Sequence, residues 1–321
     1  MNFTKRNHYN PCFWTALWND EYFDLAISGG GKQRRARQQS VHALSVKSGR
    51  VFRTTVDGIH YDKKMGIAEI TRDSAAEFVR RNHPEQYNDF LLNNECADYP
   101  VFIDFEDILT ALEGLPPYQA LMKTALSGTI EGLEQQTNIG AFIVLQCLRS
   151  HAVMNSMVDW SNELGYAKFE YFINLKWMLS DPQSLFDLVN PLVCGRWTLF
   201  TSPPQPLPLC DSAILVGPKS VMVALSPRLL LEIEPNAKTL EYTSPNYQEM
   251  PDDKFEEFRC RTIGNTFREI IGQKDVLEQW GLSEEFCSRA RLMKSVGSYN
   301  SIVHKSGEHE LWQLNAYGNR R

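Results

Sequence analysis

The spacing of hydrophobic positions changes along this 321-residue chain, from strand-like runs near the N-terminus to helical spacing in the middle. Residues 20–70 contain short runs rich in Val, Phe and Thr, separated by glycine-containing turns, and this composition is typical of strands. We therefore expect a small antiparallel β-meander near the N-terminus, with strands at 22–27, 41–46 and 51–56.

Residues 71–190 carry helical spacing instead. Apolar residues recur there every three or four positions, which is typical of amphipathic helices. The run from Ala141 to Leu148 is apolar on nearly every side, and such a helix is normally buried. The predicted helices cover 73–81, 104–115, 118–134, and a central helix that starts near residue 138.

The last part of the chain mixes both patterns. Strand-like runs alternate with one long segment of helical spacing. We expect strands at 196–200, 220–225, 228–233 and 304–311, and helices at 254–273 and 275–280. The fold class is therefore predicted as α+β in a single domain, 1–321, with a β-rich part (1–70), a helical part (71–190) and a mixed part (191–321).

Composition and charge exclude some protein classes. Hydrophobic residues make up 43% and charged residues 22%, a balance typical of a soluble globular protein. The formal net charge of -6 argues against a protein that coats nucleic acid, although a local basic patch stays open. There is neither an apolar run of about 18 residues nor a signal-peptide core. Seven singly scattered cysteines are typical of reduced thiols, so a cytoplasmic location is expected.

The densest aromatic stretch lies at residues 6–16, which we call the N-terminal hook. It holds His8, Tyr9, Phe13 and Trp14 within seven positions. Because each aromatic ring can bury a large apolar area, we expect the hook to pack into the body of the protein.

The pattern His8-Tyr9-x-Pro11-x-Phe13 resembles the opening motif, His-His-Tyr-Val-Pro-x-Phe-Tyr-Leu, of a widespread microbial family, the domain-of-unknown-function 4238 family. Asn7 replaces the first His of that motif. The resemblance covers most of the chain in short motifs and implies no established activity. Further similar segments contain Gln146 with Arg149, Trp197 with Thr201 and Ser202, Leu225 to Pro227, and Asn265.

One departure from the family pattern affects its chemistry. The resemblance implies a Ser-Asp-x-Pro loop after the strand at 196–200, but Pro203 follows Ser202 here. If the family's Asp is a base or a metal ligand, this chain has lost that function or moved it to Asp211.

Gln146 and Arg149 lie three positions apart and therefore share one face of the predicted central helix. A buried arginine needs a partner, because a lone buried charge is costly. Two interpretations stay open: a structural ion pair with an acid such as Glu131 or Glu134, or an anion-binding arginine in a pocket.

A histidine beside a tyrosine and an arginine can do acid–base work and hold an anionic group. We therefore expect a pocket formed by the hook and the central helix. The candidate catalytic residues are His8, Tyr9, Arg149 and Asn265, and the candidate ligand-binding residues are Gln146, Ser202, Asp211, His60 and Tyr61. No motif identifies a metal or a cofactor.

A glycine-rich segment at 29–31 leads into basic residues. It lacks the P-loop pattern, because Ala26 stands where the first Gly is needed and Gln33 where Ser or Thr should follow the Lys. One interpretation is a basic loop between strands. The other is a contact to an anionic substrate or a nucleic-acid backbone. The basic residues are Lys32, Arg34, Arg35 and Arg37.

Two function classes follow. The first is an intracellular enzyme of unassigned reaction, a hydrolase or nuclease-like effector of the toxin or phage-defence type, with a His/Tyr/Arg pocket. The second is a non-catalytic binding or regulatory protein on the same scaffold with a degenerate site. Pro203 favours the second class, and the retained His8, Tyr9, Arg149 and Asn265 favour the first.

Overall fold

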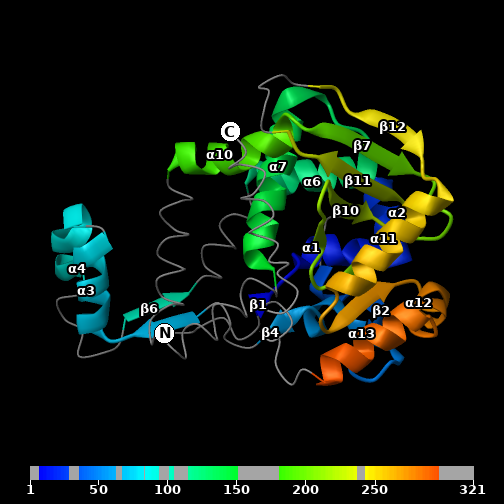
Figure 1. Cartoon of the computed structure of the whole chain (residues 1–321), viewed down its shortest axis with the longest axis horizontal. Helices are drawn as coiled ribbons and strands as arrows, with labels where there is room; N and C mark the ends of the chain where they lie inside the picture. Colours follow the sequence, from blue (N-terminus) through cyan, green and yellow to red (C-terminus); the bar gives the residue numbers. More distant parts are fainter. Residues whose placement is uncertain are drawn as a thin grey trace.

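The computed structural model has an α+β fold, which confirms the predicted class (Figure 1). It describes residues 7–28, 36–62, 67–82, 84–93, 101–104, 115–150, 181–236 and 243–295. Buried residues of the hook, the two larger sheets and the central helices form one hydrophobic core. Within the described residues, no helix has both the length and the apolar character needed to cross a membrane.

The larger sheet has five strands in the order β12-β7-β11-β10-β9. Its pairs are antiparallel except for β12, which runs parallel to β7 at the edge. Buried residues fill β9 and β10 completely, so this sheet is covered on both faces. Figure 1 shows α6 and α7 behind it and α11 in front. The strands are β7 (Arg196–Thr201), β9 (Ile214–Val216), β10 (Val221–Ser226), β11 (Leu229–Glu234) and β12 (Asn246–Glu249).

The second sheet contains the predicted N-terminal antiparallel strands. Its order is β3-β2-β13-β8, and all its pairs are antiparallel. The inner neighbour of β2 comes from a distant part of the chain, so the N-terminal strands complete their sheet through non-local pairing. The strands are β2 (Ser40–Ser45), β3 (Val51–Thr55), β8 (Leu209–Cys210) and β13 (Glu269–Gly272).

The predicted strand at 22–27 is wrong, because this segment is helix α2 (Asp20–Ile27). The Asn19 side chain caps it by accepting a hydrogen bond from the Tyr22 N–H at 2.8 Å. Two acidic residues in the first turn also stabilise the helix, because their negative charges lie at the positive end of the helix dipole. The short apolar run alone could not distinguish a strand from a helix.

The predicted helix at 118–134 is interrupted: it covers most of α6 (Pro116–Ser127) and the first residues of α7 (Gly132–Arg149). Gly128 ends α6 in the left-handed region with φ 73°, a conformation that glycine adopts without steric cost. The central helix therefore starts earlier than predicted. Its apolar middle is fully buried, as expected.

The predicted helix at 254–273 ends at residue 265, where α11 (Asp252–Asn265) stops. The segment that follows is strand β13, whose Ile270 and Ile271 are buried between β2 and β8. Ile270 and Ile271 fit the apolar spacing of a helix, but their β-branched side chains favour a strand. The other helices of this region are α10 (Pro182–Val193), α12 (Lys274–Gly281) and α13 (Glu284–Ser295).

A smaller part of the chain lies beside the two larger sheets (Figure 1). It contains the predicted helix at 73–81, here α3, which starts after Thr71 accepts a hydrogen bond from the Ser74 N–H at 3.3 Å. The predicted helix at 104–115 and strand at 304–311 fall almost entirely outside the described residues. The elements of this part are β5 (Ile67–Ile70), α3 (Arg72–Asn82), α4 (Tyr87–Asn93) and β6 (Val101–Asp104).

The hook packs into the core, as its aromatic content predicts. Trp14 is fully buried, and its ring meets Phe142 of α7 edge-on at 5.3 Å between centroids. Its indole N–H donates to the Leu225 carbonyl at 3.0 Å. The hook therefore joins the central helix to the five-stranded sheet. Its short elements are β1 (Asn7–His8) and α1 (Cys12–Thr15), and the 3-10 turn η1 (Ala16–Trp18) continues from its end.

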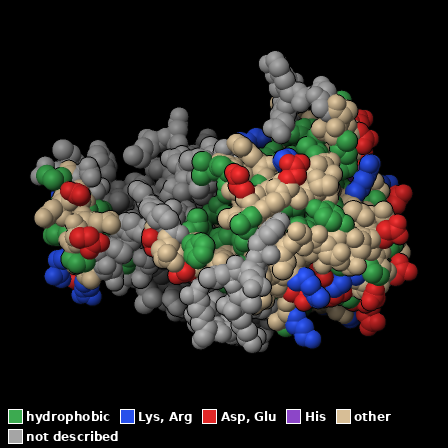
Figure 2. Space-filling model, turned by 90° about the horizontal axis from the view of Figure 1, so that it is seen from above, with side chains coloured by type: hydrophobic (Ala, Val, Ile, Leu, Met, Phe, Trp, Pro, Cys, Tyr) green, Lys and Arg blue, Asp and Glu red, His purple; other side chains and the backbone are tan. Residues whose placement is uncertain are grey.

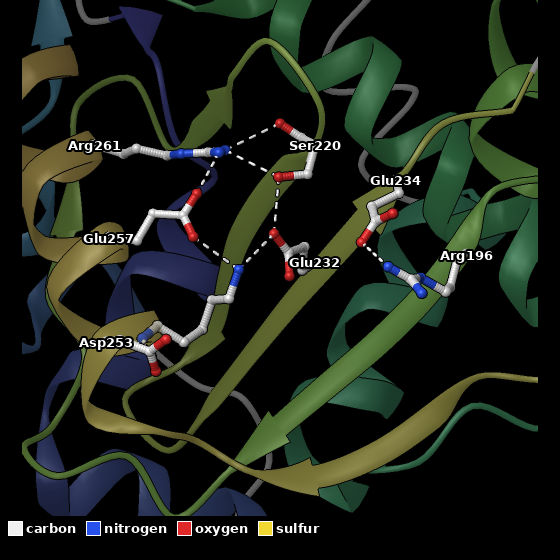
Figure 3. A network of polar contacts seen from close by, with 8 residues as sticks. Arg196, Ser220, Glu232, Glu234, Asp253, Glu257 and Arg261 are labelled. Atoms are coloured by element: carbon white, nitrogen blue, oxygen red, sulfur yellow. Dashed lines mark hydrogen bonds and ion pairs between the residues drawn. The ribbon is translucent and has the colours of Figure 1, made fainter.

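A polar network fastens α11 to the five-stranded sheet (Figure 3). Lys254 donates to Glu232 of β11 at 3.1 Å and to Glu257 at 2.8 Å. Arg261 bonds to Glu257 and, at 3.2 Å, to the hydroxyl of Ser220. The Ser220 hydroxyl in turn donates to Glu232 at 2.8 Å. Two cations and two carboxylates therefore balance one another, and we call these five residues the α11 network.

Candidate functional site

The hook begins with a short strand that brings distant residues together. Strand β1 pairs antiparallel with β4 (Tyr61–Asp62), so that His8 lies opposite Tyr61. The Tyr9 N–H donates to the His60 carbonyl at 2.7 Å. The sequence named His8, Tyr9, His60 and Tyr61 as candidates, and β1–β4 pairing brings all four to one place.

The last turn of α7 holds this hook from the other side. Arg149 Nε donates to the His8 carbonyl at 2.6 Å. Gln146 Nε2 donates to the Tyr9 carbonyl at 2.6 Å and to Asn10 Oδ1 at 3.0 Å. Both side chains are buried and share one helix face, as the spacing predicted. We call His8, Tyr9, Asn10, Gln146 and Arg149 the hook clasp.

Asn10 is a member of this group that the sequence argument missed. Its side chain is 1% exposed and donates to the Cys210 carbonyl at 2.9 Å. It also contacts His60 Nδ1 at 3.1 Å. The available signal was its position: a polar side chain inside a hook that is expected to be buried must find hydrogen-bond partners.

His60 is held by the protein at both ring nitrogens. The Asn10 amide donates to Nδ1, so Nε2 carries the proton and donates to the Glu269 carbonyl at 3.2 Å. Burial lowers the pKa of His60 to about 3, against the bond to the Glu269 backbone and with help from Arg268. His60 is therefore neutral at pH 7 and links the hook clasp to β13.

His8 is also neutral. Burial, followed by the charges of Arg149 and Arg37, lowers its pKa to about 4. Its Nε2 atom is buried and has no hydrogen-bond partner within the described residues. Among the described residues, Asp57 has its Oδ1 4.0 Å from this Nε2.

The basic segment after the glycine-rich loop meets the hook at the same acid. Arg37 Nη1 lies 4.0 Å from Asp57 Oδ1, and the Arg37 side chain is exposed. Arg34 and Arg35 fall outside the described residues. On the face seen in Figure 2, basic and acidic side chains are interspersed over the described residues. The predicted contact to an anionic substrate or nucleic acid stays a proposal.

Asp211 lies beside a residue that the hook clasp binds. It follows Cys210, whose carbonyl accepts the Asn10 bond, and it is fully buried. Its carboxylate accepts hydrogen bonds from the backbone N–H groups of Phe267 at 3.0 Å and Arg268 at 2.6 Å. Burial raises its pKa to about 6, against those two bonds and nearby arginines. Asp211 therefore holds the connection from α11 to β13.

The other two candidates have no hydrogen bond to the hook clasp. The Asn265 amide donates to the Arg261 carbonyl at 2.9 Å, inside its own helix. Ser202 is exposed after β7 with a left-handed φ of 52°. The predicted site therefore divides into a convergent group and two residues that the described contacts do not connect to it.

The predicted ion pair of Arg149 with Glu131 or Glu134 is wrong. Both acids are exposed at the start of α7, and Glu131 pairs with Lys123. Fifteen residues of helix separate Glu134 from Arg149, which at 1.5 Å per residue is roughly 22 Å. Glu131 and Glu134 are therefore excluded as partners of Arg149.

Within the parts of the chain that the structure describes, no group of three or more His, Cys, Asp or Glu side chains is arranged to hold a metal ion. The cysteines described there are free thiols.

No known family model, no curated protein and no solved structure matches this chain. The similarity of the hook to the microbial family therefore stays a prediction, and the function must be argued from the geometry.

Proposed function

We propose that this protein is a non-catalytic binding or regulatory protein, in which the hook clasp fastens the N-terminal segment to the core. The observation that supports this best is what the donors of α7 bind. Arg149 Nε and Gln146 Nε2 donate to the main-chain carbonyls of His8 and Tyr9. Groups that could hold an anionic substrate are thus committed to the protein's own backbone.

The two histidines support the same conclusion. General-base catalysis is most effective when the pKa of the base is near the operating pH. The pKa of His8 is lowered to about 4 and that of His60 to about 3. Both ring nitrogens of His60 are also bonded to Asn10 and Glu269. These side chains suit internal packing better than proton transfer.

A second candidate function has one observation in its favour. The buried His8 Nε2 lacks a hydrogen-bond partner within the described residues, and Asp57 lies 4.0 Å away beside the exposed Arg37. A buried unpaired polar atom calls for an explanation, and catalysis is one of them. The alternative is a hydrolase or nuclease-like effector in which Arg37 attracts an anionic substrate towards His8.

Conservative substitutions of His8 and Arg149 distinguish the two functions. Purified wild type, His8→Gln and Arg149→Lys are compared with Arg50→Lys, which changes an exposed residue of the turn before β3. The substrates are supercoiled plasmid DNA, ribosomal RNA, ATP and bis(p-nitrophenyl) phosphate. Growth of a bacterial host that expresses each protein is recorded in parallel.

We expect the four proteins to show the same hydrolysis as buffer alone and the same effect on growth. A wild-type activity that falls about 100-fold or more in His8→Gln, with an unchanged melting temperature, would support the enzyme instead.

A further inference from the structure

A small pocket lies between α11, α12 and the proline-rich loop that follows β7, away from the residues of the hook clasp. Its volume is about 240 Å³. Sites for drug-sized ligands usually measure about 300–1,000 Å³, so this pocket suits a smaller molecule. We propose that it binds a small neutral polyol, such as a monosaccharide. The proposal goes beyond the function proposed above because it names a ligand class at a different site.

The floor of the pocket is aromatic and rigid. Phe255 and Trp280 are almost fully buried and meet edge-on, with ring centroids 6.4 Å apart. The indole N–H of Trp280 has no hydrogen-bond partner within the described residues, although the ring lines the pocket. An apolar floor with one free donor suits a compact ligand that has C–H faces and hydroxyl edges.

Two amides form the rim. Gln205 Nε2, from the proline-rich loop, donates to Gln279 Oε1 of α12 at 3.0 Å. This bond leaves the Gln205 carbonyl free to accept and the Gln279 amide free to donate. Ser283 also lines the pocket; it accepts a hydrogen bond from the Phe286 N–H at 3.3 Å, and its hydroxyl interacts with the Glu285 side chain. The rim therefore offers both donors and acceptors.

The charges decide which ligand class can enter. Arg259 lines the pocket and is bound by two carboxylates: its Nε donates to Glu256 at 2.8 Å and its Nη1 to Glu285 at 3.3 Å. One cation and two anions sum to -1, so an anionic ligand would face a repulsive surrounding. A cationic ligand would have to compete with Arg259 for the two carboxylates that already bind it.

A neutral ligand avoids both conflicts. A hydroxyl group donates one hydrogen bond and accepts others, which matches a rim of mixed donors and acceptors. Arg259 has five N–H groups, of which two are used by Glu256 and Glu285. Neighbouring hydroxyls of a polyol fit the remaining planar donors of Arg259 and the free oxygen of Glu256.

The test uses the full chain and defined probes. Saturation-transfer NMR and calorimetric titration are run at millimolar concentration with D-glucose, D-galactose, D-mannose and myo-inositol. Citrate and putrescine serve as an anionic and a cationic probe. The variants are Gln279→Leu and Glu256→Gln, with Gln248→Leu as a matched control on the exposed edge strand β12. Thermal melting of every variant checks that the fold is kept.

We expect at least one polyol to bind, with a Kd raised about tenfold by Gln279→Leu and unchanged in Gln248→Leu. Glu256→Gln changes a residue that lines the same pocket from α11, and it should also weaken binding. Three outcomes overturn the inference: only citrate or putrescine binds, polyol binding is the same in the Gln279 variant, or no probe binds. None of these outcomes touches the hook clasp, so failure here is distinguishable from failure of the proposed function.

Discussion

The hook clasp and the α11 network solve the same problem, fastening one segment to the core, with different chemistry. In the hook clasp, buried side chains of α7 donate to main-chain carbonyls of the hook. In the α11 network, partly exposed side chains of opposite charge pair with one another (Figure 3). The hook clasp therefore fixes the path of the backbone, whereas the α11 network fixes the position of a helix on the sheet.

The difference has an energetic consequence. Removing a donor from the hook clasp leaves a carbonyl without a partner in a buried place, which costs about 1–3 kcal/mol for each group. Removing a charge from the α11 network lets water replace it, because the Lys254 and Glu257 side chains are 22% and 38% exposed. We therefore expect substitutions in the hook clasp to cost more stability than matched substitutions in the network.

Acidification should produce the largest effect. The folded pKa values of His8 and His60 are lowered to about 4 and about 3, so below pH 6.5 the unfolded chain takes up protons that the folded protein does not. Stability therefore falls as the pH falls. Asp211, raised to about 6, acts in the opposite sense, because its folded form is protonated first and gains stability below pH 6.

Together these three groups predict a loss of roughly 4 kcal/mol between pH 6.5 and pH 4. Urea unfolding across this range should be compared between wild type and His60→Gln. The slope of unfolding free energy against pH should be smaller in the variant than in the wild type, and the difference should be about 1.4 kcal/mol per pH unit. Parallel curves for the two proteins would show that His60 is not a buried neutral group.

Arg149→Met should be the most damaging single change in the hook clasp. It removes the donor to the His8 carbonyl and should lower the free energy of unfolding by roughly 3 kcal/mol. The control is Arg196→Met, since Arg196 pairs with Glu234 at the surface with its side chain 72% exposed. The control should lose less than about 1 kcal/mol. Equal losses in urea unfolding would remove the contrast between buried and exposed arginines.

Gln146→Leu should follow with a loss of about 2 kcal/mol. The substitution introduces an apolar side chain of similar size and removes the bonds to the Tyr9 carbonyl and to Asn10. Its effect should not add fully to that of Arg149→Met, because both donors hold the same short segment. A double-mutant cycle in urea measures this coupling, and strict additivity would argue against one shared clasp.

The smallest effect belongs to the α11 network. Lys254→Met should cost about 1 kcal/mol, since Glu232 keeps the Ser220 hydroxyl as a donor at 2.8 Å. Raising the salt concentration should reduce this cost, because partly exposed charges are screened. A loss larger than that of Arg149→Met would reverse the ranking of the two assemblies.

What could be predicted from the sequence followed from short-range periodicity. Gln146 and Arg149 were assigned to one helix face because helical spacing fixes that relation, and the structure confirms it. The strands β2 and β3 were also found, because a turn separates two strand-like runs. The burial of the hook followed from its aromatic content.

What could not be predicted depends on contacts between distant residues. Asn10 bonds to residues 50 and 200 positions away, and no local pattern encodes those partners. The same holds for β13. Ile270 and Ile271 fit a helical pattern locally, and their strand conformation depends on pairing with the distant strands β2 and β8. Asn265 is a candidate through the family resemblance, but its amide donates within its own helix.

The fastening of the hook can be measured directly at one amide. The Tyr9 N–H donates to the His60 carbonyl at 2.7 Å, and Arg149 holds the preceding carbonyl. Hydrogen exchange should show this amide protected like those of β10 in the wild type, and exchanging much faster in Arg149→Met. A Tyr9 amide that exchanges as in an unfolded peptide, or one whose protection is the same in Arg149→Met, would contradict the hook clasp.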